Sequence, residues 1–554
     1  MKKFLVFVLT ILFLKLTVLA CTNFLVSKGA SIDGTPMITY AADAHVLYGE
    51  LYYTAAAVYP EGAMLDIYEW DTGKYLGKIP QVRKTYAVVG NMNEHQVAIG
   101  ETTYGGRKEL RNKDGIMDYG SLIYVTLQRA KTARQAIEIM NDLVQTYGYY
   151  SSGESFSIAD KNEVWIMDLI GKGKDEKGAV WVARRVPDGY VSGHANQARI
   201  RQFPLKDKKK ETLYSPDVIS FARKMGYFKG EDKNFSFVDA YAPIDYGALR
   251  FCEIRVWAMF NRILPKDQRI NSDYIDGVAG AKPMPLWVKP ARKLGVKDLM
   301  ELMRDHLQGT KFDMEKGVGA GPYKLPYRWR PLTWEVEGQK GVKYCNERAT
   351  STQQTGFSFV SQSGRRLNDK RNTLLPDPIG GILWFGLDDT NSTVYTPMYC
   401  GIRSVPKSFA VGTGSFNEFT WESAFWVFNF VSNYAYSRYS DMIQDIKKVQ
   451  GELEGNYIAM TKEIDQAAYS LYKKSPELAR EYLTKYSVET GDALTKRWKK
   501  LGEFLIFKYL DGNMKDENNK VTHPGYPKAW YKRITEESGD FFKMKKLPGK
   551  KGSH

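Results

Sequence analysis

The sequence predicts an α+β fold in which layered β-sheets carry helices on their outer faces. Between residues 21 and 411, short runs of β-branched and aromatic residues alternate with turns rich in Gly, Asn, Asp and Pro, a pattern typical of strands joined by hairpins. Longer segments with apolar residues three and four apart interrupt these runs and indicate helices. After about Thr420 the strand pattern gives way to helical periodicity. Sheets and helices in this arrangement are expected to stack as layers.

The first 20 residues have the features of a signal peptide. Two lysines precede an apolar run from residue 4 to 14, and Val-Leu-Ala at 18–20 fits the small-residue pattern of a cleavage site. The run is shorter than the roughly 20 apolar residues of a transmembrane helix. We therefore expect an exported protein, periplasmic or extracellular, whose mature chain begins at Cys21 and has no membrane span.

Cys21 has two possible fates at this new N-terminus. A terminal cysteine carries a thiol and a free α-amine, which together form a nucleophile and its base for cleaving an amide. Bacterial lipoproteins also begin with a cysteine after the leader, where acylation blocks both groups. The residues that follow, Thr-Asn-Phe-Leu-Val at 22–26, have the composition of a strand and not of a polar tether. This favours the nucleophile over the lipid anchor.

The region from 21 to 411 contains several predicted hairpins and helices. The hairpins join 155–158 to 164–167, 179–186 to 190–192, and 86–89 to 97–99. Apolar spacing predicts helices over 119–146 and 296–307. A further short hairpin, with its turn near 31–34, is expected to bring the end of the strand over 37–42 beside Cys21.

The C-terminal region is predicted to be mainly helical, over 421–454 and 457–509. It is expected to be a cap packed on the first region, with a dimerisation arm or a lid as the alternatives. The predicted domains are thus a signal peptide over 1–20, a hydrolase domain over 21–411, and a helical region with a basic tail over 412–554.

Composition limits the partners and cofactors. The formal net charge is +16; the three lysines of the leader account for part of it, so the mature chain carries +13. These lysines are dispersed and no nucleic-acid motif appears, which indicates a solvated basic surface and no nucleic-acid partner. Cys252, Cys345 and Cys400 are scattered and are expected to be free thiols, with at most one disulfide among them. The chain has six histidines and neither Cys-x-x-Cys nor His-Glu-x-x-His, so we expect no metal and no other cofactor.

A thiol that attacks an amide needs its amine oriented and its oxyanion stabilised. A carboxylate commonly orients the amine, and side-chain amides are suitable oxyanion donors. Asp43 ends the extended run after the first predicted turn, Asn93 lies in the turn of a hairpin, and Asn196 follows the strand ending near residue 192. Such residues in turns usually serve backbone hydrogen bonds, and it is their combination with Cys21 that makes them candidates.

The sequence resembles the dipeptidase A (PepD) family of cysteine-type N-terminal nucleophile hydrolases, which are secreted bacterial dipeptidases. The similarity begins with CTNFLVSKGASIDG at 21–34. It continues in order with GNMNEHQVAIGE at 90–101, DKNEVW at 160–165, WVARRVPDG at 181–189, GGILW at 380–384 and YTPMY at 395–399. The motifs span the hydrolase domain, whereas the helical region has weaker signatures.

This resemblance implies a four-layer αββα sandwich and hydrolysis of dipeptides or short peptides by Cys21 once the leader is removed. It also implies homo-oligomers as a possibility. It assigns Asp43 to the nucleophile's amine, Asn93 to the oxyanion, Asn196 to a second polar position and Arg250 to an arginine near the nucleophile, for which Arg255 is an alternative.

Two other functions remain open from the sequence. Related enzymes of the superfamily are choloylglycine hydrolases and penicillin acylases, which cleave non-peptide amides, and the acylases often carry an arginine three residues before the aspartate. Tyr40 occupies that place here, which argues mildly against such substrates. The third possibility is a non-enzymatic surface lipoprotein acylated at Cys21.

Overall fold

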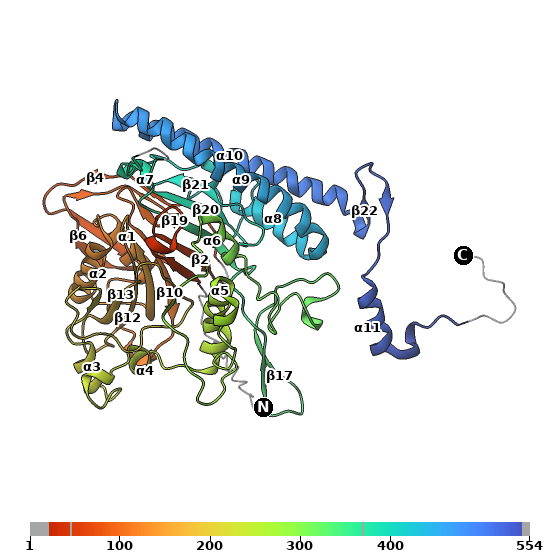
Figure 1. Cartoon of the computed structure of the whole chain (residues 1–554), viewed down its shortest axis with the longest axis horizontal. Helices are drawn as coiled ribbons and strands as arrows, with labels where there is room; N and C mark the ends of the chain where they lie inside the picture. Colours follow the sequence, from red (N-terminus) through yellow and green to blue (C-terminus); the bar gives the residue numbers. More distant parts are fainter. Residues whose placement is uncertain (1–20, 45–46, 368–370, 546–554) are drawn as a thin grey trace, which may run out of the picture.

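Two large antiparallel β-sheets form the centre of the molecule (Figure 1). The computed structural model describes residues 21–44, 47–367 and 371–545. The predicted signal peptide and the end of the basic tail lie outside the described residues. The mixture of these sheets with helices is an α+β fold, as the sequence predicts.

The first sheet has seven strands and contains the start of the mature chain. Its order is β16 (Trp287–Val288), β14 (Val191–His194), β1 (Asn23–Val26), β2 (Met37–Asp43), β19 (Thr355–Gln362), β20 (Ile382–Leu387) and β21 (Thr396–Tyr399). β1 and β2 pair antiparallel with Leu25 opposite Ile38, so the predicted hairpin with its turn near residues 31–34 is present. β1 is thus a central strand with neighbours on both sides.

The second sheet has eight strands and packs against the first. Its order is β15 (Thr212–Tyr214), β13 (Ala179–Arg185), β12 (Val164–Gly171), β11 (Gly153–Ala159), β10 (Ala98–Tyr104), β9 (Met92–Asn93), β8 (Val88–Val89) and β3 (Tyr53–Thr54). β1 contacts β10, β11 and β12, and β2 contacts β10 and β11. The N-terminal strands of the first sheet therefore face the middle of the second.

Helices cover the outer faces of both sheets. α1 (Tyr119–Leu127) and α2 (Ala133–Tyr147) share an apolar cluster with the second sheet. α8 (Ala424–Tyr436), α9 (Tyr439–Tyr472) and α10 (Pro476–Lys508) pack on β20 and β21 of the first sheet, and Figure 1 shows them along that side of the molecule. α5 (Ile254–Ile263) and α6 (Val296–Met303) lie near the ends of the same sheet, with α6 against β2 and β19.

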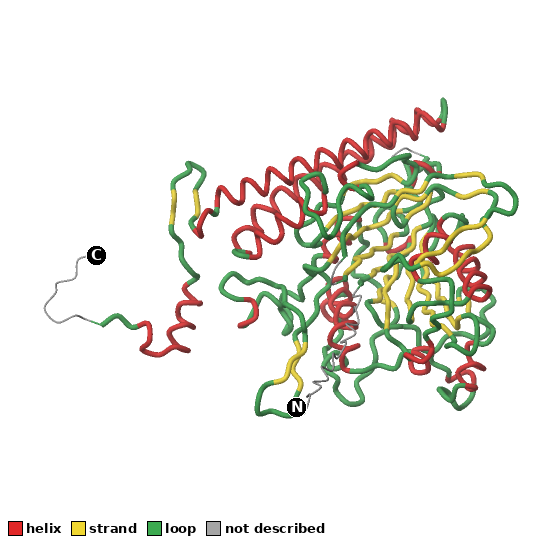
Figure 2. Tube along the Cα trace, turned by 180° about the vertical axis from the view of Figure 1, so that it is seen from behind, coloured by secondary structure: helices red, strands yellow, loops and turns green. Residues whose placement is uncertain are grey.

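Shorter elements complete the structure. They are α3 (Val218–Lys224), α4 (Phe237–Tyr241), α7 (Asp377–Gly380), and the two-stranded pairs β4 (Ala57–Val58) with β7 (Lys84–Thr85), β5 (Met64–Tyr68) with β6 (Tyr75–Pro80), β17 (Thr333–Glu335) with β18 (Lys343–Cys345), and β22 (Met514–Lys515) with β23 (Val521–Thr522). β22, β23 and α11 (Lys528–Ser538) extend away from the rest of the chain in both views (Figure 2). No helix within the described ranges is both long and apolar enough to cross a bilayer.

Several predicted elements differ in the structure. The break predicted between 454 and 457 is absent, because α9 continues from Tyr439 to Tyr472. The segment 119–146 is two helices and not one, because Thr132 caps a new helix by accepting a hydrogen bond from the backbone N–H of Gln135. The segments over 179–186 and 190–192 are strands, but they do not pair, since β13 lies in the second sheet and β14 in the first. The turn at 187–189 therefore carries the chain between the sheets. The third predicted hairpin contains an additional strand, β9, between β8 and β10.

His194 is a buried titratable group between the sheets. Its Nδ1 and Nε2 atoms lie 2.7 Å from the hydroxyls of Thr102 and Ser157, respectively. Burial, followed by the positive charges of Arg199 and Arg255, lowers the pKa of His194 to about 3. The folded protein therefore keeps this imidazole neutral at pH values where an exposed histidine binds a proton.

Acid pH is expected to destabilise the protein through His194. Below about pH 6.5 the histidine binds a proton in the unfolded chain, whereas in the folded chain it stays neutral until about pH 3. The free energy of unfolding therefore decreases as the pH falls through this window, by up to about 1.4 kcal/mol per pH unit. Urea unfolding of His194→Gln between pH 6 and 4 should show a shallower loss than the unaltered chain. The exposed His523 offers the matched control, His523→Gln. Equal slopes in His194→Gln and the unaltered chain would contradict this assignment.

Candidate active site

Cys21 lies just before β1, where the start of β1 lies beside the end of the antiparallel strand β2. Thr22 pairs with Ala41, which places Cys21 next to the end of β2 and its last residue, Asp43. Cys21 is 2% exposed. Its Sγ atom is 3.6 Å from Oε1 of Glu101 and 3.8 Å from the hydroxyl of Tyr40. The thiol is thus enclosed by polar groups at the interface of the two sheets.

The carboxylate of Asp43 is held by residues far along the chain. Nη2 of Arg348 lies 2.6 Å from Oδ2, and the hydroxyl of Thr355 donates to Oδ1 at 2.7 Å. Burial raises the pKa of Asp43, whereas Arg348 and Thr355 act to lower it. Asp43 lies beside Cys21 as predicted, but no signal in the sequence indicates its arginine partner.

The protonation state of Cys21 follows from these surroundings. Burial raises the pKa of the thiol well above its ordinary value, and the negative charges of Glu101 and Asp43 raise it further. While residue 20 is attached to Cys21, the nitrogen of Cys21 is an amide and is unable to accept a proton. The thiol is therefore held in its protonated, unreactive form until a base becomes available beside it.

Arg255, on α5, contacts Cys21. Its Nη1 donates to the backbone oxygen of Cys21 and to the hydroxyl of Thr22, each at 2.6 Å. Its Nη2 donates to Oδ1 of Asn196 at 2.8 Å, and Nδ2 of Asn196 donates to the backbone oxygen of Thr103 at 2.6 Å. One guanidinium thus connects Cys21 to the predicted site residue Asn196.

Arg250 is not placed at this site, and its assignment is corrected to Arg255. Arg250 pairs with the carboxylate of Glu347 and lies 3.6 Å from Asp276. Arg250 lies in the π-helical segment Ala248–Glu253, whereas Arg255 lies in α5. Among the described contacts, only Arg255 reaches the backbone of Cys21. Because the two arginines are close in sequence, the sequence alone did not indicate which of them contacts Cys21.

Asn93 also has a different role from the predicted one. Its Nδ2 donates to the backbone oxygens of Leu127 and Ala130, both at 2.7 Å, and its Oδ1 accepts from the backbone N–H groups of His95 and Val97. Both amide hydrogens are therefore used to attach the connection between α1 and α2 to the second sheet. This side chain is not available as an oxyanion donor.

Sequence reasoning missed Glu101 and Arg348 as site residues. A signal for Glu101 was present, because it is a lone acidic residue in the strand Ala-Ile-Gly-Glu-Thr-Thr-Tyr at 98–104, and a buried unpaired carboxylate in a strand is rare. Arg348 carries no comparable signal. Tyr40, noted only as a departure from an arginine pattern, proves to contact the thiol.

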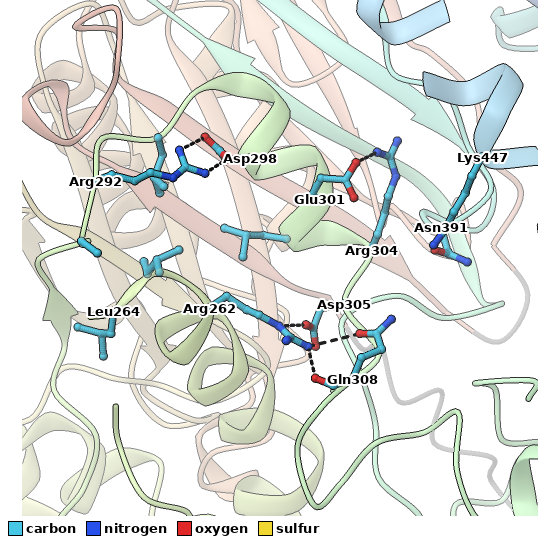
Figure 3. A pocket seen from close by; sticks show the side chains of 14 residues that line it. Arg262, Leu264, Arg292, Asp298, Glu301, Arg304, Asp305, Gln308, Asn391 and Lys447 are labelled. Atoms are coloured by element: carbon cyan, nitrogen blue, oxygen red, sulfur yellow. Dashed lines mark hydrogen bonds and ion pairs between the residues drawn. The ribbon is translucent and has the colours of Figure 1, made fainter. Parts of the chain in front are cut away.

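A 740 Å³ cavity lies elsewhere, between α5, α6 and α9, and it contains no predicted site residue (Figure 3). Ion pairs line it, among them Arg262 with Asp305 at 2.7 Å and Arg304 with Glu301 at 2.8 Å. Its charged groups thus largely satisfy one another. The part of the chain that the structure describes has no group of acidic, histidine and cysteine side chains arranged to hold a metal ion, and all four cysteines, including Cys252, Cys345 and Cys400, are free.

Comparison with known proteins gives a consistent set of similarities. The family model described as peptidase family C69 matches residues 20–452. A probable dipeptidase of Salmonella dublin is 25% identical over 425 residues, covering 73% of this chain and 86% of that protein. A probable dipeptidase of Latilactobacillus sakei is 23% identical over 503 residues, covering 86% of this chain and 94% of that protein. A dipeptidase of Bifidobacterium longum is 24% identical over 345 residues, covering 56% of this chain and 63% of that protein.

Proposed function

Because the chain belongs to peptidase family C69, we propose that it is a dipeptidase in which Cys21, freed by removal of the leader, is the nucleophile. The observation that carries this proposal is the surroundings of Cys21. Its thiol, the Asp43–Arg348 ion pair and the Arg255–Asn196 pair meet at the start of β1. Relatives named as dipeptidases support the choice of substrate.

The layers of the structure support assignment to the N-terminal nucleophile hydrolases. Two facing sheets with helices on both outer faces correspond to the αββα sandwich of that group. We also propose that 21–411 is the hydrolase domain, that 412–554 is an added helical region which caps it, and that the protein is exported. Dipeptides or short peptides are the partners in this proposal.

The proposed mechanism uses the amine of Cys21 as the base. After cleavage of the Ala20–Cys21 bond, the α-amine accepts the thiol proton, since a free α-amine has a pKa of about 7.7–8.0. The thiolate attacks the peptide carbonyl carbon and forms a tetrahedral oxyanion. The protonated amine then gives its proton to the departing amino group, and the C–N bond breaks to leave a thioester. Water hydrolyses the thioester by the same relay in reverse.

We assign positioning roles to the residues around the nucleophile. Asp43, fixed by Arg348 and Thr355, orients the ammonium form of the amine. Arg255 fixes the backbone at Cys21 and the orientation of the Asn196 amide. Asn196 keeps the second polar position that was predicted for it, and a backbone N–H is assigned as the oxyanion donor.

The proposed function is tested by identifying the mature N-terminus and the substrates. We expect mass spectrometry of the exported protein to find an unmodified Cys21 as its first residue. The purified protein should hydrolyse a panel of dipeptides, whereas the same chain with its leader attached should not. As comparison substrates, bile-salt conjugates and phenoxymethyl penicillin represent the alternative amide hydrolases. An acylated Cys21, or hydrolysis restricted to these conjugates, would overturn the proposal.

A further inference from the structure

Two buried glutamates face each other beside the nucleophile. Glu101 on β10 is 1% exposed and Glu154 on β11 is fully buried. Their strands pair so that Thr103 is opposite Glu154, which sets the two carboxyl groups diagonally across the ladder. The hydroxyl of Tyr40 donates to Oε1 of Glu101, and that of Thr103 donates to Oε1 of Glu154 at 2.7 Å. The Oε2 atoms have no other hydrogen-bond donor among the described residues, and the two carboxyl groups interact with each other through a shared proton.

Within the described ranges this carboxyl pair has no cationic partner, unlike the neighbouring Asp43. Burial is the main cause that raises the pKa of both Glu101 and Glu154. The negative charges of Glu101 and Asp71 raise the pKa of Glu154 further. Asp43, by contrast, is 2.6 Å from the guanidinium of Arg348. Buried carboxylates are normally paired because an isolated charge is costly in the interior. The carboxyl groups of Glu101 and Glu154 therefore form a candidate binding site for a cationic group.

The distance between Glu101 and the thiol of Cys21 indicates which part of a substrate carries this cationic group. A reacting carbonyl carbon lies about 3–3.5 Å from the attacking atom, and the α-nitrogen of the same residue is two bonds from that carbon, about 2.5 Å away. In a bound substrate, the α-ammonium group therefore lies close to the Sγ atom of Cys21. Oε1 of Glu101 is 3.6 Å from Sγ of Cys21, within hydrogen-bonding reach of that group.

We propose that Glu101, supported by Glu154, binds the α-ammonium group of the residue whose carbonyl Cys21 attacks. This inference rests on the proposed function and deepens it by assigning the residues that recognise the free amino terminus of the substrate. An ammonium group supplies three N–H donors and a positive charge to a carboxyl pair that has no cation beside it among the described residues. An N-acylated peptide supplies neither the charge nor the second and third donors, so it is rejected.

The test compares a dipeptide with its des-amino analogue, in which hydrogen replaces the α-amino group. The unaltered processed protein should show a kcat/KM at least about 100-fold higher for the dipeptide. In Glu101→Gln the dipeptide should lose at least about 100-fold in kcat/KM, mainly through KM, while the analogue changes less than about threefold. Glu253→Gln, at another buried glutamate, is the matched control and should keep the original ratio.

Two outcomes overturn the inference, and a separate one concerns the proposed function. Equal losses on both substrates in Glu101→Gln would show that the carboxyl group acts on the thiol or on the amine of Cys21 itself. A Cys21→Ala protein that binds the dipeptide and its analogue equally in calorimetry would also overturn it, and this measurement leaves Glu101 unchanged. If the unaltered processed protein cleaves neither compound, the proposed function fails, and preferential dipeptide binding by Cys21→Ala would still support the ammonium site.

Discussion

Replacing Cys21 by alanine in the processed chain is expected to abolish peptide hydrolysis and to leave the fold intact. The attacking atom is lost, and removal of a catalytic nucleophile lowers kcat by about 10⁴–10⁶-fold in enzymes whose site residues act as a unit. The thiol is small and buried, so its removal is expected to cost no more than about 1–2 kcal/mol of unfolding free energy. Steady-state hydrolysis of a dipeptide, with circular dichroism as the measure of folding, gives both quantities.

The control for this variant is another cysteine in the same chain. Cys345→Ala, on the two-stranded pair formed by β17 and β18, should retain the full rate. Cys21→Ser should keep at most a trace of activity, because an alcohol is a weaker nucleophile than a thiolate. Unreduced hydrolysis by Cys21→Ala would remove the basis of the proposed mechanism.

Replacing Arg348 by methionine is expected to have the largest effect on stability. It leaves the buried carboxylate of Asp43 without its cation, and breaking a buried ion pair from one side costs about 3–5 kcal/mol. The same change frees Asp43 to move, so dipeptide hydrolysis should fall as well. Urea unfolding at neutral pH measures the loss of unfolding free energy, and the dipeptide assay measures the rate.

A double variant separates the two effects of this ion pair. In Asp43→Asn/Arg348→Met no charge is left unpaired, so most of the lost stability should return, whereas activity should not, because the carboxylate that orients the amine is gone. Arg250→Met is the matched control, since the carboxylates around Arg250 are partly exposed and such pairs contribute less. A cost at Arg348 no greater than that at Arg250 would argue against the importance of the Asp43 pair.

Local sequence signals predicted the elements around Cys21 well. The strand after Cys21, the turn near residue 34 and the strand ending at Asp43 are adjacent in sequence, and alternation with turn chemistry is enough to define such a hairpin. The same signals failed at 187–189. A Pro-Asp-Gly turn shows that the chain reverses there, but it does not show whether the next strand joins the same sheet or the opposite one.

The partners of the site residues were harder to predict for a physical reason. Arg348 reaches Asp43 and Arg255 reaches Cys21 only through the tertiary fold, and no local pattern of charge or hydrophobicity encodes such contacts. Asn93 illustrates the opposite error. This residue was predicted to be an oxyanion donor, but its amide makes the backbone hydrogen bonds that asparagines in turns usually make.

The ion pair between Asp43 and Arg348 also determines when the enzyme can first become competent. The two residues are 305 positions apart, and Thr355 is 312 positions from Asp43. Contacts between such distant residues form late, because a long loop must close before they are gained. A chain whose synthesis has not passed residue 355 therefore contains Cys21 without the groups that orient it. On the proposed mechanism, a chain that loses its first 20 residues before that point therefore has no active peptidase site.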